Sequence, residues 1–365
     1  MDETAQHSHG QCRGPVFVCG AGHQGLSMAA HLAISGHGVT LWNRTLGNIA
    51  EVARTLEIRC TGVVSGVGKI KAASDVIDEV VGDLIMVATP SSAHKDVARR
   101  LAPFVHEDMV VVLNPGRTFG AIEFAQELLA SGVKSLPHIA ETQTIAYTCR
   151  RDTEGNAVIH AIKDGVRIAT LGDDMDVVMA ALPACLAPHF EPVSSVAITS
   201  LGNVGMILHC APVLLNCGWI ETEDVDFKYY YHGISPSIAG FIERLDRERI
   251  AVARALGFEV ESTADWMRRV YGVEGEGILE CIRNNPAYRE IDAPPTIRCR
   301  YVLEDVPNGL VPLADLALQL GVPAPCANTV IDLADEVIGS DFRSTGRRFP
   351  VSVLEKYIGD MRVES

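Results

Sequence analysis

Short apolar runs alternate with helix-like stretches along the first half of the chain. Five runs are apolar almost throughout, as is typical of strands buried on both faces of a sheet, and they occupy residues 15–20, 38–42, 83–89, 109–113 and 167–172. Between these runs, for example over 24–35 and 121–129, the apolar positions recur at helical spacing. Strands that alternate with helices form βαβ units, so the pattern predicts a mostly parallel, doubly wound sheet of the α/β class.

The pattern changes near residue 193, and from there the apolar stretches have helical spacing. Several of them end in glycine, which is a frequent helix stop signal, and the clearest cover residues 200–219, 235–257, 262–272, 310–321 and 326–339. No run of comparable strand quality follows. We therefore expect a sheet domain over 14–192 and an all-α domain over 193–365 with a cleft between them, and a disordered polar leader over 1–13.

A glycine-rich turn directly follows the first predicted strand. Gly20, Gly22 and Gly25 have the spacing Gly-x-Gly-x-x-Gly, and a predicted helix begins within the motif. The first glycine allows a tight turn, the second lets the backbone approach a pyrophosphate, and the third lets helix and strand pack closely. His23 and Gln24 then lie at the helix N-terminus, which faces the phosphates with partial positive charge. In this context the motif predicts a Rossmann-type domain that binds a dinucleotide.

The end of the second predicted strand bears on which dinucleotide binds. An acidic residue there would accept hydrogen bonds from the ribose of NAD, but this chain has Asn43 followed by Arg44. A guanidinium pairs well with the 2′-phosphate of NADP, so we expect NADP(H) to be preferred over NAD(H), with a solvated surface arginine as the alternative. Thr89, Pro90 and Asn114 follow two later strands, at the edge where cofactors bind, although ordinary turn chemistry explains them equally well.

Composition and charge exclude several other functions. The formal net charge is −15 at pH 7, which disfavours non-specific binding to nucleic acids and anionic membranes. No uninterrupted apolar run is long enough to span a bilayer, and the N-terminus lacks the pattern of a signal peptide. The ten cysteines form no C-x-x-C pair and most lie in apolar runs, so we expect reduced thiols in a cytoplasmic protein and no metal site.

One ionisable side chain, His209, interrupts the apolar stretch at 200–219. Taken alone it has two interpretations, a hydrogen-bonded core histidine or a catalytic group, and the core interpretation is the commoner one. Arg300 and Asp305 share one segment that runs into a Pro-Asn-Gly turn, and Glu141 lies near a strand end. The alternative for Arg300 and Asp305 is a local structural ion pair.

Several segments taken together resemble one family of dehydrogenases. They are "LNPGRTFGAIEF" (113–124), "GNVGMILHCAP" (202–212), "RYVLEDVPNGLVPL" (300–313) and "DFRSTGR" (341–347). They resemble the opine dehydrogenases, also called the octopine/nopaline dehydrogenase family, and most closely its bacterial members. The resemblance covers nearly the whole chain from the glycine turn onward. The glycine turn is shared by many dehydrogenases, whereas these segments in combination are specific.

The resemblance implies an enzyme that joins the amino group of an amino acid to the carbonyl of a 2-oxo acid, often pyruvate, and reduces the imine with NAD(P)H. Matched motif by motif, it implies that His209 is the catalytic histidine, that Asp305 supports it and that Arg300 binds the oxo acid. Glu141 and Asn203 match further residues of the family's cleft, where Glu141 would meet a cationic side chain or the α-amino group of the amine. Imidazole suits this proton transfer because it titrates near neutral pH.

Other interpretations remain open at this point. Cys210 stands where the family often has proline, which puts the local helix geometry in question. The main alternative is a 2- or 3-hydroxy-acid dehydrogenase with the same two-domain plan, but such enzymes often carry a lysine on the corresponding helix, and this chain has none between Leu201 and Trp219. The other is a nicotinamide-binding sensor without catalysis. The family includes monomers and dimers, so a homodimer is also open.

Overall fold

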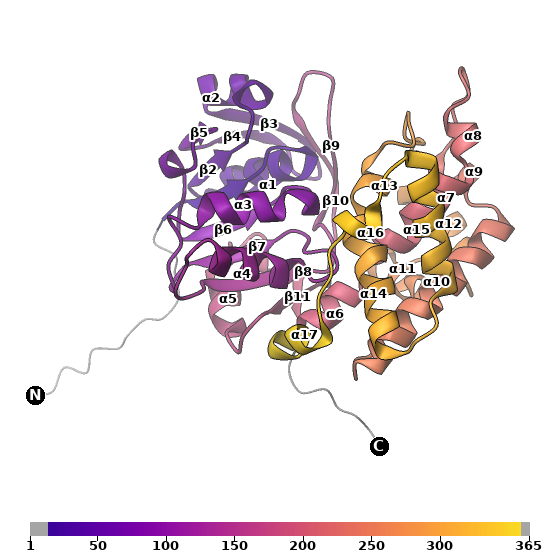
Figure 1. Cartoon of the computed structure of the whole chain (residues 1–365). Coiled ribbons are helices and arrows are strands. Elements are labelled where there is room, and N and C mark those ends of the chain that lie inside the picture. Colours follow the sequence, from indigo (N-terminus) through magenta and orange to yellow (C-terminus); the bar gives the residue numbers. More distant parts are fainter. Residues whose placement is uncertain (1–13, 359–365) are drawn as a thin grey trace, which may run out of the picture.

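Six parallel strands form the centre of the computed structural model, which describes residues 14–358 (Figure 1). Their order is β8-β7-β6-β1-β2-β5, as expected for a doubly wound domain. Their bounds are β1 (Val16–Cys19), β2 (Val39–Trp42), β5 (Ala72–Ser74), β6 (Leu84–Val87), β7 (Val110–Leu113) and β8 (His138–Thr142). The leader predicted at 1–13 lies outside the described residues.

Helices cover both faces of this sheet, which is why its strands are apolar throughout. Val16 and Val18 of β1 pack in the cluster that includes α1, whereas Phe17 and Cys19 pack in the cluster that includes α3 and α4. The helices of this half are α1 (His23–Ile34), α2 (Ala50–Thr55), α3 (His94–Leu101), α4 (Gly120–Ala130) and α5 (Met175–Ala181). Short 3₁₀ turns in the whole described chain are η1 (Leu46–Ile49), η2 (Ile77–Glu79), η3 (Ser91–Ala93), η4 (Ala187–His189) and η5 (Pro286–Tyr288).

The last predicted strand of the sheet runs in the opposite direction to its neighbour. β11 (Val166–Thr170) pairs antiparallel with β8, and β12 (Phe190–Pro192) then pairs parallel with β11. The sheet therefore has eight strands and is mixed at this edge. An apolar run indicates burial on both faces but carries no information about direction, so the sequence did not reveal the reversal.

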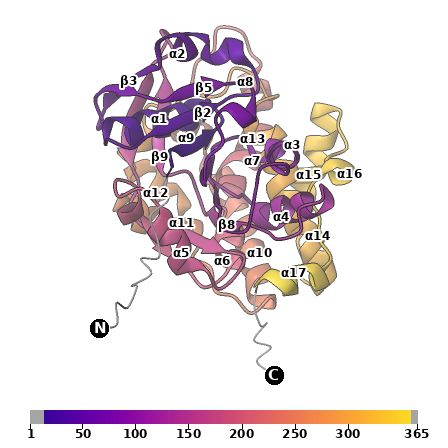
Figure 2. The same cartoon turned by 90° about the vertical axis from the view of Figure 1, so that its left-hand side faces the viewer.

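A second, four-stranded sheet was not predicted from the sequence pattern. Its order is β4-β3-β10-β9, and it lies against α1, which is thereby held between the two sheets (Figures 1 and 2). Its strands are β3 (Glu57–Gly62), β4 (Gly66–Lys69), β9 (Tyr147–Arg151) and β10 (Ala157–Ile162). Buried and exposed residues alternate along β3, so these strands lack the continuous apolar runs by which the main sheet was recognised.

The second half of the described chain is helical, as predicted, and contains no further strand up to residue 358. Its helices are α6 (Val196–Leu201), α7 (Gly205–Leu215), α8 (Cys217–Ile220), α9 (Tyr229–Gly233), α10 (Pro236–Ala255), α11 (Thr263–Tyr271), α12 (Ile278–Asn284), α13 (Arg300–Leu303), α14 (Val311–Leu320), α15 (Pro325–Ile338), α16 (Phe342–Thr345) and α17 (Val351–Ile358). The change from strands to helices falls between β12 and α6, next to the boundary expected at residue 192.

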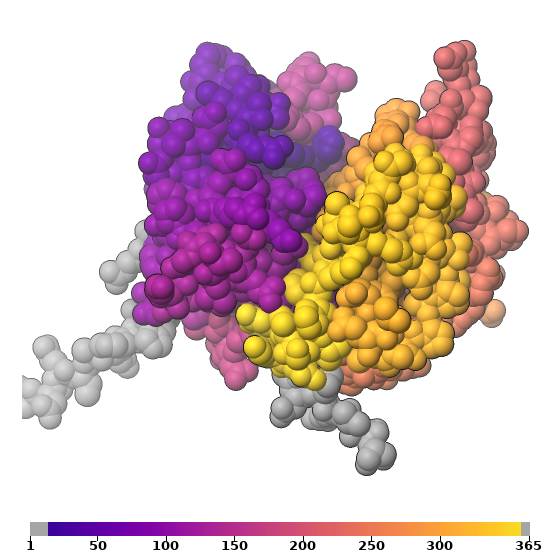
Figure 3. Space-filling model, viewed as in Figure 1, coloured from indigo at the N-terminus to yellow at the C-terminus, as the bar shows by residue number. Residues whose placement is uncertain are grey.

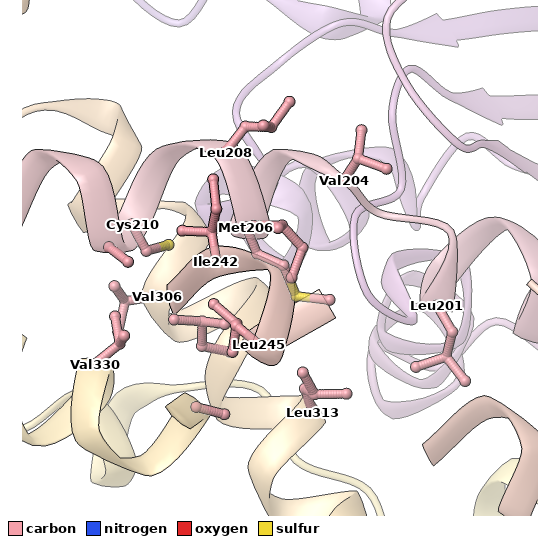
Figure 4. Close-up of a cluster of buried hydrophobic side chains, with 14 of the residues drawn as sticks. Leu201, Val204, Met206, Leu208, Cys210, Ile242, Leu245, Val306, Leu313 and Val330 are labelled. Carbon is pink, nitrogen blue, oxygen red and sulfur yellow. The ribbon is translucent and has the colours of Figure 1, made fainter. Parts of the chain in front are cut away.

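Helix α7 lies at the centre of the helical domain, in contact with α10, α13 and α15. Figure 4 shows Met206 and Cys210 on the side of α7 that faces Val306 and Leu313, and Leu208 on the other side. The stretch Val196–Leu215 has the length and apolar composition of a membrane span, but 78 % of its most apolar window is buried inside the protein. Packing against neighbouring helices accounts for its apolar surface.

The Pro-Asn-Gly segment predicted as a turn is helical instead. One turn of π-helix, η6 (Val306–Leu310), carries the chain from the end of α13 into α14, and Asn308 N–H donates to the Glu304 carbonyl at 3.1 Å. A Cβ on Gly309 would come within 2.9 Å of the Met206 Cβ. This glycine therefore permits close packing against α7, and the turn propensity that suggested a loop is overridden by tertiary contacts.

The C-terminal segment crosses back onto the first domain. Figure 3 shows it in yellow against both halves of the molecule. Arg347 donates from Nη1 to the Thr118 carbonyl and from Nη2 to the Glu123 carboxylate, each at 2.7 Å. At the end of α17, the Ile358 carbonyl accepts a hydrogen bond from the Ser195 hydroxyl at 2.8 Å. The Arg347 contacts hold the helical domain against the loop that follows β7 and against α4, whereas the Ser195–Ile358 bond holds α17 to the start of α6.

A buried ion pair fixes α10 against its neighbours. Arg249, which is fully buried, donates to Asp246 at 2.7 and 2.9 Å, to the Leu201 carbonyl at 2.5 Å and to the Glu261 carbonyl at 2.8 Å. Asp246 also accepts from the backbone and hydroxyl of Thr263. The pair therefore satisfies the carbonyl at the end of α6 and connects α10 to the start of α11.

We predict that Arg249→Met lowers the free energy of unfolding by about 3 kcal/mol, because it leaves a buried carboxylate without its cation. Urea denaturation followed by circular dichroism measures the change. Arg254→Met, on the exposed face of the same helix, is the control and should have little effect. Equal destabilisation by the two substitutions would contradict a role for the buried pair.

Candidate active site

The glycine turn has the geometry that a dinucleotide requires. Gly20 adopts φ +107°, a conformation that favours glycine, and a Cβ on Gly25 would lie 1.9 Å from the Gly20 carbonyl oxygen. At Gly22 a Cβ would meet no atom within 4 Å, so the surface is open there for a ligand to approach. His23 and Gln24 begin α1, and the buried Gln24 Nε2 has no hydrogen-bond partner in the protein.

A groove beside this turn fits the adenosine half of such a cofactor. It is lined by the end of β2, including Asn43 and Arg44, and by Thr89 and Pro90 after β6. Asn43 holds the turn by accepting from the Ala21 N–H at 3.2 Å, while the Arg44 side chain is exposed. The groove has one carboxylate in its lining, Asp96, and this is bound to Arg100 at 2.9 Å. The anionic groups of a dinucleotide therefore meet no unpaired acid here.

Two further buried polar atoms lack partners near the same edge of the sheet. They are the Thr89 hydroxyl and the Asn114 Oδ1. Buried polar groups are nearly always hydrogen-bonded. Buried polar atoms without a partner at the carboxyl ends of strands therefore indicate a place where a ligand supplies the hydrogen bond. Together with Gln24, they make the predicted cofactor residues a coherent set that would hold a dinucleotide along the glycine turn.

A cleft of about 840 Å³, counting the part open to solvent, lies between the two domains. The first domain contributes Arg117 and the segment 143–150, and the second contributes Asn203, His209 and Arg300. The cleft therefore brings together three of the five residues predicted for catalysis and substrate binding. Asp305 lies directly behind them, fully buried.

His209 and Asp305 form the central pair of the site. The His209 Nδ1 lies 2.7 Å from the Asp305 Oδ2, and the Tyr301 ring stacks on the imidazole with centroids 3.9 Å apart. Burial lowers the pKa of His209, and although Asp305 acts in the opposite direction, the pKa stays below its ordinary value of 6.5. The helix is continuous through Cys210 and Pro212, so the departure at Cys210 leaves the histidine in place.

Arg117 was not predicted from the sequence as a site residue, yet it contacts Asp305, Glu304 and Asn203. It follows Asn114 on the loop after β7 and lies 3.4 Å from the Asp305 Oδ1 and 3.4 Å from the Glu304 carboxylate. Burial by itself raises the pKa of Asp305, but Arg117 and His209 lower it by more. The pKa therefore lies below its ordinary value, and this carboxyl group stays ionised. Arg117 follows the carboxyl end of a parallel strand, and this position could have indicated a site residue from the sequence. Only the fold showed which acids Arg117 reaches.

Asn203 and Arg300 occupy the predicted cleft positions with different degrees of exposure. Asn203 is buried, accepts from the Gly205 N–H at 3.1 Å and is 3.4 Å from the Arg117 Nη1. The Arg300 side chain is 52 % exposed, and its one carboxylate contact is Glu304 at 3.5 Å. Arg300 is therefore accessible to an anionic ligand, whereas Asn203 helps to hold Arg117.

The structure places Glu141 outside the cleft, which corrects its prediction as a substrate-binding residue. Its Oε2 accepts from the Ala121 N–H at 2.9 Å, and its Oε1 accepts from the hydroxyls of Thr199 at 2.8 Å and Ser200 at 2.5 Å. The residue is fully buried and connects α4 to α6. The sequence correctly placed Glu141 near the carboxyl end of a strand, β8. The packing of α6 against β8 decides where its side chain lies.

No group of three or more His, Cys, Asp or Glu residues in 14–358 is arranged to hold a metal ion. The nine described cysteines are all free. The arrangement offers a dinucleotide groove, a histidine supported by a carboxylate and a cleft lined by cationic side chains.

Known proteins share this architecture over almost its whole length. Octopine dehydrogenase, solved in complex with NADH and agmatine, superposes with a TM-score of 0.74 at 18% identity and covers 94% of this chain and 95% of its own. Yersinopine dehydrogenase with NADP⁺ bound gives a TM-score of 0.69 at 16% identity and covers 95% of each chain. At this level of identity the two matches show a common fold.

The sequence comparisons go further than the fold. Residues 16–160 match the family model described as ketopantoate reductase PanE/ApbA, and residues 192–338 match the model of the NAD/NADP octopine/nopaline dehydrogenase, alpha-helical domain. The opine dehydrogenase of Arthrobacter sp. (strain 1C) is 34% identical over 339 residues, which cover 90% of this chain and 92% of that protein. The chain therefore belongs to the opine dehydrogenase family.

Proposed function

We propose that the protein condenses the amino group of an amino acid with the carbonyl of a 2-oxo acid and reduces the imine to an N-(carboxyalkyl) amino acid, and that it catalyses the reverse oxidation. The bound nicotinamide cofactor would supply or accept the hydride. The observation that carries the proposal is the His209–Asp305 pair, buried at a cationic cleft beside a dinucleotide groove. Octopine dehydrogenase itself has been solved with NADH and L-arginine and with NADH and pyruvate.

His209 is suited to carry the protons of this reaction. Its lowered pKa leaves the imidazole neutral at pH 7, so it can accept the proton released when the amine attacks the carbonyl. Asp305 fixes the tautomer through Nδ1 and stabilises the imidazolium that forms. The same proton is then available to the hydroxyl that leaves as water. Arg300, exposed at the cleft, would bind the carboxylate of the oxo acid through its planar guanidinium.

The lining of the cleft favours an amino acid with an apolar side chain. One wall consists of Leu208, Tyr230, Trp266, Tyr288 and Ile291, and no Asp or Glu lines the cleft among residues 14–358. A cationic side chain such as that of arginine would find no carboxylate here, because Glu141 is buried elsewhere. An apolar side chain would instead gain from transfer out of water onto this wall.

Two further features concern the cofactor and the cellular setting. The absence of an acidic residue at Asn43–Arg44, with the exposed guanidinium beside the groove, supports a preference for NADP(H) over NAD(H).

The nine free cysteines in the described chain agree with a reducing cytoplasm, and the net charge of −15 disfavours nucleic acid or an anionic membrane as a partner.

Incubation with NADPH, pyruvate and a panel of amino acids should consume NADPH only when amine and oxo acid are both present. Leucine, methionine and phenylalanine should be turned over faster than arginine and lysine, because the cleft lacks a counter-charge. Absorbance at the nicotinamide band measures the rate, with each substrate omitted in turn as the control. Consumption with pyruvate alone would contradict the proposal and indicate a hydroxy-acid dehydrogenase.

Asp305→Asn should lower kcat about 100-fold, a typical loss for impaired acid–base catalysis, while the Kd for NADPH stays near that of the wild type. Asp305 raises the pKa of His209, so its removal should lower that pKa further and move the acidic limb of the kcat/KM profile to lower pH. Asp108→Asn, at an exposed position, is the matched control. A loss of NADPH binding in Asp305→Asn would argue against a catalytic role.

Arg44→Ala should raise the KM for NADPH about tenfold and leave the KM for NADH unchanged, because a hydrogen-bonded ionic contact to the 2′-phosphate is lost. Initial rates with each cofactor at saturating substrates give the two constants. Arg54→Ala removes an exposed arginine of the same domain and serves as the control. If both cofactors lose affinity equally, Arg44 does not distinguish them.

A further inference from the structure

One buried cation of the described chain has no acidic partner. Four cationic side chains are buried among residues 14–358, and they are Arg117, Lys163, Arg249 and Arg347. Each of the three arginines lies within 4 Å of a carboxylate. No carboxylate of the described chain lies within that distance of Lys163. A buried charge of this kind destabilises the folded protein unless something else compensates it.

Lys163 is part of the wall of the substrate cleft. It follows β10, and its backbone N–H donates to the Ala146 carbonyl at 2.8 Å, which fixes the residue against the segment before β9. The Nζ donates to the Ile145 carbonyl at 3.0 Å. An ammonium has three N–H donors, so two remain for a ligand in the cleft.

The electrostatic surroundings of Lys163 also lack a compensating acid. Burial lowers its pKa to about 8, and the charged or titratable groups that act on it are Cys149, Arg117 and Arg300. Both arginines oppose its charge. The lysine is thus mostly protonated at pH 7 and held in a site that favours an arriving anion.

The proposed reaction supplies such an anion. Its product carries two carboxylates, one on each side of the secondary amine, and Arg300 accounts for the one that comes from the oxo acid. Building on the proposed function, we propose that Lys163 binds the α-carboxylate of the amino-acid substrate and thereby selects α-amino acids over simple amines. The amino group would then lie between the two cations, and the side chain would face the aromatic wall.

Arg150 also lines the cleft but is a weaker candidate for this role. Its side chain is exposed, and it donates to the Cys149 carbonyl. Its neighbour Arg151 donates from the backbone to the His23 Nδ1 at 2.8 Å, which places this end of β9 beside the glycine turn. Arg150 therefore lies nearer the expected cofactor phosphates than Lys163 does.

The test compares an amino acid with the amine that it gives on decarboxylation, for leucine 3-methylbutylamine, in wild type and Lys163→Met. The variant should lose about 10- to 100-fold in kcat/KM for the amino acid and less than about twofold for the amine, because only the amino acid has the carboxylate. Lys163→Arg should retain most of the activity. Lys134→Met, at an exposed position outside the cleft, is the control.

A pH series separates binding by Lys163 from a structural role. Lys163, with a pKa of about 8, loses its charge at higher pH, whereas an arginine at this position stays charged. The KM for the amino acid should therefore increase in the wild type, relative to that of Lys163→Arg, as the pH is raised beyond 8. The Tm of unliganded Lys163→Met should equal or exceed that of the wild type, since an unpaired buried charge is removed.

Equal losses on the amino acid and the amine, or a rise confined to the KM for pyruvate or NADPH, would overturn this assignment while leaving the proposed function intact. A lower Tm combined with unchanged discrimination between the two amines would overturn it too. If the wild type turns over no pair of amine and oxo acid, the proposed function itself fails, and that outcome is visible before any variant is made.

Discussion

The buried ion pair between Arg117 and Asp305 is the interaction on which the site depends. The guanidinium comes from the loop after β7 in the first domain, and the carboxylate comes from the helical domain. Desolvating either charge alone would be costly, so the two are retained together only when the domains are packed. The same carboxylate fixes His209 through its other oxygen. One carboxylate therefore joins the two domains through Arg117 and orients His209.

The charge distribution around that contact explains how an acidic protein can offer a site for anions. The overall charge is −15, yet the cleft is lined by cationic side chains and by no described carboxylate. Glu304 and Asp305 lie behind the wall and are occupied by Arg117, Arg300 and His209. Because the compensating acids are buried, the field in the cleft stays positive, which favours carboxylates and the phosphates of a dinucleotide.

Rigidity in the site comes from α7. One side of this helix, which includes Met206 and Cys210, packs in the core of the helical domain (Figure 4). His209 and Leu208 of the same helix line the cleft. A catalytic side chain on a helix packed on several sides is held more firmly than one on a loop, which suits the geometric demands of proton and hydride transfer. The C-terminal segment holds the facing domain in register through Arg347, which bonds to Thr118 and Glu123.

The sequence alone determined the two-domain plan, the glycine turn and the main parallel strands, because burial periods and local backbone requirements are encoded by neighbouring residues. The candidates His209, Asp305 and Arg300 followed from the resemblance to the opine dehydrogenases, since their spacing alone left a core histidine and a local ion pair open. It did not determine the second sheet, the reversed β11, the burial of Glu141 or the positions of Arg117 and Lys163. Arg117 lies 187 positions before Glu304, and Glu141 58 positions before Thr199. Which charges meet, and which one is left without a partner, depends on contacts across such distances, and only the tertiary structure decides them.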